Sequence, residues 1–138
     1  MSQKKSPEDK QLIDTSARIL FSKRVEEVTL MNLSKLSDIC DYYLIGTCQS
    51  EAQMKAVITG LSRGLKELTG RPLAIDYRHG DRWAVLDFGN LLVHLFEEEY
   101  RQQISIERLW ADAEKSELNK EDYLDNDVEQ DEEEDEYL

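Results

Sequence analysis

The sequence has few residues of the kinds that cross-link a small protein through disulfide bonds or anchor it in a membrane. Its two cysteines, Cys40 and Cys48, form neither a CxxC pair nor a disulfide framework. No stretch approaches the ~18 consecutive apolar residues of a membrane span. The polar start, MSQKKSPEDK, lacks the apolar stretch of a secretory signal and is too acidic and too poor in arginine for a good organelle transit peptide. We therefore expect a cytoplasmic protein with two free, buried thiols, and a catalytic cysteine is the less favoured alternative.

Several kinds of catalytic site also lack their usual residues. The two histidines, His79 and His94, match no metal-binding spacing. The segment GLSRG lacks the lysine of a phosphate-binding loop, and no serine or cysteine lies in a strained elbow motif. We therefore expect no catalytic residues, no bound metal and no cofactor.

The negative charge is concentrated at the end of the chain. The 138 residues carry a formal net charge of −13. Residues 112–138 contain 14 acids against two lysines, whereas residues 1–111 contain 16 acids and 15 bases. Because the last segment also has almost no apolar periodicity, we predict one folded domain at 1–111 and a disordered acidic tail at 112–138. Solubility is the favoured role of the tail, with repulsion of nucleic acid or contact with a basic surface as alternatives.

Hydrophobic periodicity predicts the element order α-β-β-α-β-β-β-α. The first helix should begin at Ser6-Pro7 and run to about residue 23. A capping box of Ser50 and Gln53 should open the second helix, and Gly70 should end it. Strands are predicted at 25–33, 41–47 and 73–78 and in the two arms of a hairpin within 81–101. The expected fold class is α/β, a single domain with a mixed sheet of about five strands flanked by helices.

The hairpin, DRWAVLDFGNLLVHLFEEEYR, is the most informative stretch. A two-residue turn at Gly89-Asn90 would make Trp83 oppose Phe96 and Asp87 oppose Leu92. One face is then wholly apolar and must be core: Ala84, Leu86, Phe88, Leu91, Val93 and Leu95. The other face, called here the mixed face, combines aromatic, aliphatic and ionisable side chains: Trp83, Val85, Asp87, Leu92, His94 and Phe96.

Three interpretations of the mixed face stay open. Asp87 and His94 are diagonal neighbours, so a catalytic pair is conceivable, but a structural hydrogen bond between them is clearly favoured. The third interpretation is a docking surface for a protein partner, because aromatic residues anchor interfaces and charges set their register. Its anchors would be Trp83, Leu92 and Phe96, and its polar groups would be Asp87, His94, Glu98 and Arg101. The competing expectation is that the second helix of the chain covers this face.

Two motifs resemble those of a known family, the ribosomal silencing factors, also called the Iojap or RsfS family. The motifs are WAVLDFGNLLVHLFEEEYR and IERLWADA, and the resemblance covers roughly residues 10–111. The positions that match the family pattern are Trp83, Asp87, Gly89, His94, Glu98, Arg101, Glu107 and Trp110, with Asp41 in the segment SDICDYYLIGT. The chain departs from the pattern at Ala52, where the family usually has arginine, and in its acidic tail.

The resemblance implies a fold similar to the nucleotidyltransferase α/β core without its catalytic acids. It also implies a non-enzymatic translation repressor that docks on a large-subunit ribosomal protein, number fourteen, at the subunit interface. Docking there would block joining of the small subunit when growth slows. Two alternatives are a divergent nucleotidyltransferase that uses Asp41, Asp76 or Asp87, and a structural oligomer whose hairpin edge pairs with itself. The free protein is also a candidate homodimer.

Overall fold

Six strands form one mixed sheet with the order β3-β4-β5-β2-β1-β6. The computed structural model describes residues 7–69, 72 and 74–124. The central strands β2 and β5 run parallel, and every other neighbouring pair is antiparallel. The strands are β1 (Glu26–Asn32), β2 (Tyr42–Cys48), β3 (Ala74–Asp76), β4 (Trp83–Asp87), β5 (Leu91–Glu97) and β6 (Glu114–Glu117). The predicted mixed α/β fold is confirmed, with one strand more than expected.

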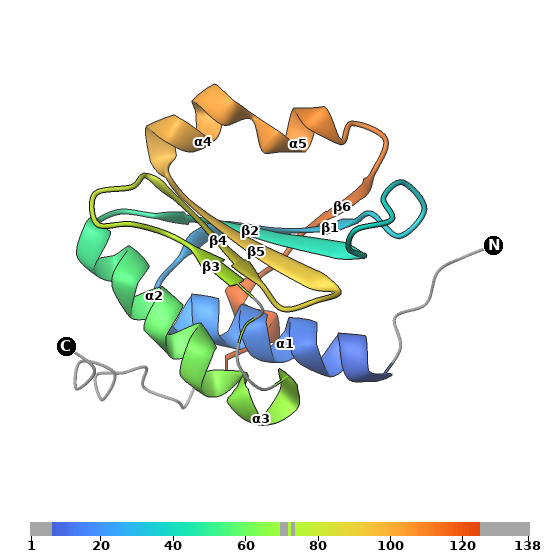
Figure 1. Cartoon of the computed structure of the whole chain (residues 1–138), viewed down its shortest axis with the longest axis horizontal. Helices are drawn as coiled ribbons and strands as arrows, with labels where there is room; N and C mark the ends of the chain where they lie inside the picture. The colour runs from blue at the N-terminus through green and yellow to red at the C-terminus, as the bar shows by residue number, and fades with distance from the viewer. Residues whose placement is uncertain (1–6, 70–71, 73, 125–138) are drawn as a thin grey trace.

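Helices cover both faces of the sheet (Figure 1). On one face lie α1 (Pro7–Ser22), α2 (Glu51–Gly64) and the short α3 (Lys66–Thr69). Over the other face lie α4 (Glu98–Ile104) and α5 (Ile106–Leu109), and a 3-10 turn, η1 (Lys120–Asp122), follows β6. The larger core fills the space between the sheet and α1–α2 and contains the whole apolar face of the hairpin.

The second helix begins where its cap was predicted but ends earlier. The Ser50 side chain accepts a hydrogen bond from the backbone N–H of Gln53 at 3.0 Å. The helix ends at Gly64, and its cap, Leu65, turns the chain into α3. A Cβ atom on Gly64 would lie 2.5 Å from Cδ1 of Ile19, so glycine lets α1 pack closely against α2. The predicted stop at Gly70 lies outside the described residues.

The hairpin has the predicted register. Trp83 pairs with Phe96, and Asp87 pairs with Leu92. Gly89 has φ +92°, which an L side chain rarely adopts, and the N–H of Phe88 donates to the carbonyl of Leu91 across the turn. The turn chemistry therefore fixed which side chains share a face.

The prediction that residues 112–138 form a disordered tail was wrong for the part that the structure describes. The strand β6 begins at Glu114 and pairs antiparallel with β1. Beyond it, Tyr123 stacks on Phe21 at 5.7 Å, and Leu118 and Leu124 pack against the larger core. The folded part therefore continues past residue 111 to at least Leu124, and residues 125–138 lie outside the described ranges.

Candidate functional site

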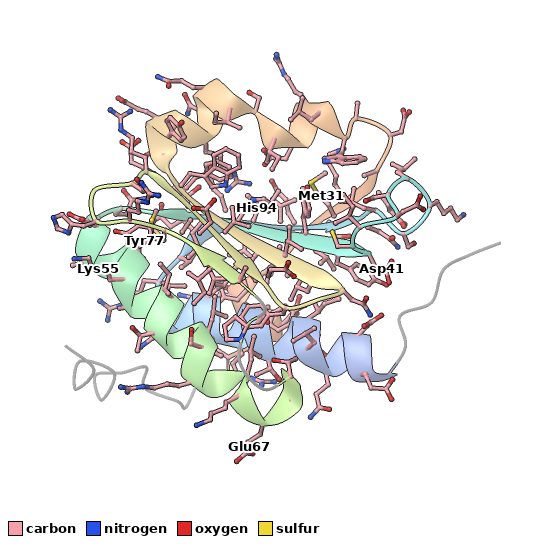
Figure 2. The ribbon with its side chains drawn as sticks, viewed as in Figure 1. Met31, Asp41, Lys55, Glu67, Tyr77 and His94 are labelled. Carbon is pink, nitrogen blue, oxygen red and sulfur yellow. The ribbon has the colours of Figure 1, made fainter. Side chains whose placement is uncertain are left out.

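The mixed face of the hairpin is half covered by the chain itself. A second, smaller core lies between this side of the sheet and α4–α5, and Figure 2 shows Met31 and His94 within it. Its buried members are Met31, Leu33, Cys40, Ile45, Phe96, Ile106 and Ala113. The second helix lies on the opposite side of the sheet, so the expectation that it covers the mixed face was wrong. The α4–α5 segment covers it instead, because α4 begins directly after β5 and turns the chain back over the sheet.

This cover buries two residues that were expected to be exposed docking groups. Phe96 is 0% exposed and His94 is 4% exposed. The side chain of Phe96 packs in the second core, and the ring of Trp83 stacks on it with centroids 5.0 Å apart. As the structure stands, neither Phe96 nor His94 presents a surface to a partner.

The expected hydrogen bond between Asp87 and His94 was also wrong. Oδ1 of Asp87 accepts from the backbone N–H of Gly89 at 2.9 Å, which braces the turn. Nδ1 of His94 accepts from Nε1–H of Trp83 at 3.1 Å. Burial lowers the pKa of His94 to about 4, so the imidazole is neutral at physiological pH. The arrangement supports the sheet and the turn and does not orient a general base.

The β4 side of the mixed face stays partly exposed, and so does Leu92 of β5 beside the turn. Trp83, Val85, Asp87 and Leu92 are each partly buried. A cleft of about 450 Å³ lies beside Trp83 at the β3–β4 edge. Its other lining residues are Asp76, Gly80, Asp81, Arg82, Val85 and Tyr100, and the guanidinium of Arg82 lies 5.7 Å from the centre of the Tyr100 ring. Aromatic, aliphatic and acidic groups therefore meet at one accessible place.

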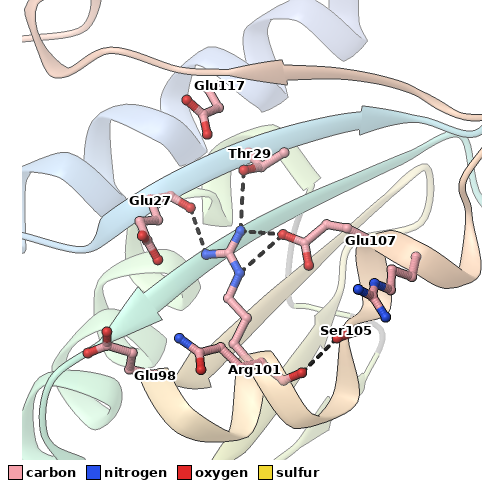
Figure 3. A pocket seen from close by; sticks show the side chains of 9 residues that line it. Glu27, Thr29, Glu98, Arg101, Ser105, Glu107 and Glu117 are labelled. Atoms are coloured by element: carbon pink, nitrogen blue, oxygen red, sulfur yellow. Dashed lines mark hydrogen bonds and ion pairs between the residues drawn. The ribbon is translucent and has the colours of Figure 1, made fainter.

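Arg101 holds α4–α5 onto the sheet from inside (Figure 3). Its Nε and Nη2 donate to one carboxylate oxygen of Glu107 at 3.2 and 2.6 Å. Nη2 also donates to the hydroxyl of Thr29, and Nη1 donates to the Thr47 hydroxyl and the Glu27 carbonyl. All five guanidinium N–H groups are thus used within the chain, and the residue is 8% exposed. This geometry connects α4 and α5 to β1 and β2 and leaves Arg101 no free donor for a partner.

The backbone of β1 adapts to this arginine. The pairing of β1 with β2 shifts register between Glu26 and Thr29, and Glu27 there has φ +53°. A left-handed conformation in a non-glycine residue costs about 1–3 kcal/mol and persists only where its surroundings hold it. The carbonyl of Glu27 accepts from Nη1 of Arg101 at 2.7 Å, which is one such restraint. Exposed Glu98 and partly buried Glu107 line a cleft of about 380 Å³ beside this cluster, together with Glu27 and Glu117.

The two cysteines lie in environments that disfavour the reactive thiolate. Burial raises the pKa of the Cys40 thiol to about 11 and that of Cys48 to about 12, so both stay protonated at neutral pH. Both thiols are free and buried, as predicted. Among the described residues, no group of three or more His, Cys, Asp or Glu side chains could hold a metal ion. Within the same ranges, no helix has the length and apolar character needed to cross a membrane.

Sequence reasoning gave no role in the site to three aromatic residues that complete this region, although one of them, Trp110, is among the positions that match the family pattern. Tyr43 lies 4.3 Å from the His94 ring, Tyr100 lies beside Trp83, and Trp110 packs edge-on against Tyr43. Tyr43 belongs to β2, which is parallel to β5, and Tyr100 and Trp110 follow the hairpin. The adjacency of β2 and β5, which brings Tyr43 to His94, is not visible in either segment alone.

Known proteins match this chain along most of its length. The family model for the ribosomal silencing factor during starvation, RsfS, matches residues 5–137. A protein from Halalkalibacterium halodurans named ribosomal silencing factor RsfS is 28% identical over 110 residues, 80% of this chain and 94% of that protein. The mouse protein named mitochondrial assembly of ribosomal large subunit protein 1 is 26% identical over 102 residues, 72% of this chain and 45% of the mouse protein.

Solved structures match the fold. A crystal structure of a Bacillus halodurans protein has a TM-score of 0.68 and 26% identity, covering 79% of this chain and 99% of that one. A Chromobacterium violaceum protein has a TM-score of 0.70 at 22% identity, covering 74% of this chain and 85% of that one. Because the family model extends over nearly the whole sequence, the chain belongs to the RsfS family of ribosomal silencing factors.

Proposed function

We propose that this chain is a non-enzymatic silencing factor that binds the large ribosomal subunit. The observation that carries the proposal is the family match over residues 5–137. The printed names of the relatives support it, since they describe ribosomal silencing or assembly of the large subunit. The cytoplasmic location expected from the sequence and action in slowly growing cells belong to the same proposal.

The proposed contact is with large-subunit ribosomal protein number fourteen at the subunit interface, where the bound chain would block subunit joining. The partly exposed positions of the mixed face, along β4 and at Leu92, form the docking surface that we favour. Trp83 and Leu92 are its partly exposed apolar members, and Asp87 carries a charge suited to a basic partner. Glu98 is exposed at the start of α4, at the rim of the neighbouring cleft. Phe96, His94 and Arg101 act beneath this surface rather than on it.

Two substitutions test the docking surface. Asp87→Asn keeps an oxygen that accepts from Gly89, so it should change the melting temperature little and weaken binding by about 1–3 kcal/mol. Trp83→Ala should weaken binding by about 2 kcal/mol or more, as loss of an aromatic anchor does. Leu68→Ala is the control, because Leu68 is an exposed apolar residue on α3, on the opposite side of the sheet.

The measurements are co-sedimentation of each variant with purified large subunits and light scattering of subunit joining. Melting curves of the same variants correct the affinities for any unfolded fraction. Unchanged affinity of the folded Asp87→Asn and Trp83→Ala proteins would locate the docking surface elsewhere. Failure of the wild-type chain to bind large subunits would remove the proposed function itself.

The alternatives are tested separately. A divergent nucleotidyltransferase using Asp41, Asp76 or Asp87 should bind ATP with magnesium at micromolar concentration in calorimetry, whereas we expect no binding up to millimolar nucleotide. A self-pairing oligomer, or a homodimer of the free protein, should show a concentration-dependent mass in sedimentation of the pure chain. Binding to large subunits is compatible with such a homodimer only if the docking surface is free in it.

A further inference from the structure

We propose that His94 is a positioning residue that holds the indole of Trp83 in its docking orientation through a hydrogen bond to Nδ1. This inference rests on the proposed function for its consequence, but the bond itself is a property of the free protein. It assigns to a buried histidine a role that acts through its neighbour and not by contact with the partner.

The bond sets the protonation of the imidazole. Nδ1 of His94 accepts from Nε1–H of Trp83 at 3.1 Å, so the single proton of the neutral ring lies on Nε2. Nε2 is buried without a hydrogen-bond partner among the described residues. Only the neutral form with the proton on Nε2 fits this site, because a protonated ring would present an N–H to the indole N–H.

The surroundings hold the imidazole itself in place. The centre of the Tyr43 ring from β2 lies 4.3 Å from that of the imidazole, with 58° between the planes. The centre of the Phe96 ring lies 6.3 Å from that of the imidazole, with the planes nearly parallel. The centre of the Trp83 ring from β4 lies 6.0 Å from that of the imidazole, and the Tyr100 ring of α4 lies 6.4 Å from the centre of the same indole. Of the rings that contact His94, Tyr43 alone carries a titratable group, a phenol whose pKa burial raises, so it stays neutral. Burial of His94 favours its neutral form as well.

Stacking alone would not fix the indole. Trp83 stacks on Phe96 with centroids 5.0 Å apart and planes 22° apart, and such contacts tolerate sliding and rotation of the ring. The hydrogen bond from Nε1 selects one orientation, because a half-buried indole N–H without an acceptor is unfavourable. Trp83 also lines the cleft, together with Val85 and Tyr100. A partner that meets an already oriented ring loses less conformational entropy on binding.

Two substitutions of His94 separate positioning from packing. His94→Asn keeps an acceptor near the position of Nδ1, whereas His94→Leu fills much of the space without any acceptor. The sequence has two tryptophans, so a ¹H–¹⁵N spectrum of the free protein contains two indole signals, and Trp110→Phe assigns them. We expect His94→Leu to move the Trp83 indole proton upfield and His94→Asn to leave it close to its wild-type position.

Affinity for large subunits should follow the indole signal. We expect His94→Leu to bind roughly three- to ten-fold more weakly, the range for one lost hydrogen bond, and His94→Asn to bind within about two-fold of wild type. Equal indole shifts in the two variants, or equal affinities of the two folded proteins, would overturn the inference.

A titration of the wild-type protein covers the case in which His94→Leu does not fold. As the pH falls toward the pKa of His94, the Trp83 indole signal should shift while the Trp110 signal serves as the internal reference. A Trp83 signal that stays constant until the protein unfolds would overturn the inference. If the indole behaves as expected but the wild-type chain does not bind large subunits, the proposed function fails and the hydrogen bond stands.

Discussion

Arg101 gives the sharpest test of how the second core is held together. Its guanidinium makes five hydrogen bonds: two reach Glu107 on α5, and three reach Glu27, Thr29 and Thr47 on β1 and β2. Figure 3 shows the bonds to Glu107, Glu27 and Thr29. Arg101→Met keeps a long apolar side chain of similar reach and removes all five. The substitution therefore tests the bonds with limited change in packing volume.

The expected loss of stability in Arg101→Met follows from the burial of Arg101 and Glu107. Breaking a buried ion pair by removing one member costs about 3–5 kcal/mol. The Glu107 side chain is 28% exposed, so water partly solvates the carboxylate that remains, and we lower the expectation to roughly 3 kcal/mol. For a domain of this size, ~4 °C of melting temperature corresponds to 1 kcal/mol, so Arg101→Met should melt about 12 °C lower.

Arg108→Met is the matched control for this substitution. Arg108 lies on α5 and lines the same cleft, but it is exposed, so the same change of charge should alter stability by no more than about 0.5 kcal/mol. Arg101→Lys should recover only part of the loss, because one ammonium cannot reproduce a planar guanidinium fork. Thermal melting by circular dichroism measures all three.

A double-mutant cycle assigns the loss to the ion pair. Glu107→Gln, alone and combined with Arg101→Met, should show a coupling energy of about 1 kcal/mol or more. If Arg101→Met melts within ~2 °C of Arg108→Met, the guanidinium cluster does not hold α4–α5, and this reasoning is refuted.

Two further predictions concern acid and the end of the chain. The folded pKa of His94, about 4, lies below the value of 6.5 for an exposed histidine, so between these values the unfolded chain binds the extra proton. Neutral His94 should therefore contribute up to roughly 3 kcal/mol to the free energy of unfolding above pH 6.5, and this contribution should be lost as the pH falls toward 4. In chemical denaturation over this pH range, the free energy of unfolding of His94→Leu should depend less on pH than that of the wild type. A chain cut after Ala113 loses β6 and the packing of Leu118, Tyr123 and Leu124, so it should melt ~10 °C or more below wild type. A chain cut after Leu124 keeps this packing, so its melting temperature should change by less than ~2 °C. Equal melting of the two truncated chains would contradict the packing role of residues 114–124.

The parts of the fold that sequence predicted well are those set by neighbouring residues. The Gly89-Asn90 turn fixes the hairpin register because the positive φ of Gly89 allows a two-residue connection. Ser50 and Gln53 locate the start of α2 because the capping hydrogen bond spans only three residues. In both cases the sequence contains the donor, the acceptor and the backbone freedom within one short segment.

The strand β6 escaped prediction because its own residues carry no strand signal. Glu114, Lys115, Ser116 and Glu117 are all exposed, and their acidic surroundings resemble the tail that follows. The segment forms a strand because β1 offers a free edge and because Ala113 before it and Leu118 after it pack in the smaller and larger cores. Charged residues on an edge strand also disfavour pairing with the strands of other chains. The same acidic residues that made β6 hard to predict therefore disfavour aggregation at this edge of the sheet.

The site was harder to predict because periodicity tells which residues share a face but not what covers that face. The cover, α4–α5, consists of two short helices held by contacts between Arg101 and residues far away in the sequence. The cover buries two β5 positions of the mixed face and leaves its β4 positions partly exposed. Phe96 and His94 lie under the cover, so their substitution should act mainly on stability or through a neighbour, whereas Asp87 and Leu92, at the turn end of the hairpin, stay partly exposed. Trp83, opposite Phe96, belongs to both parts: its indole N–H donates to His94, and the residue lines the cleft, so in the complex that we propose one ring would connect the core of this protein to its partner.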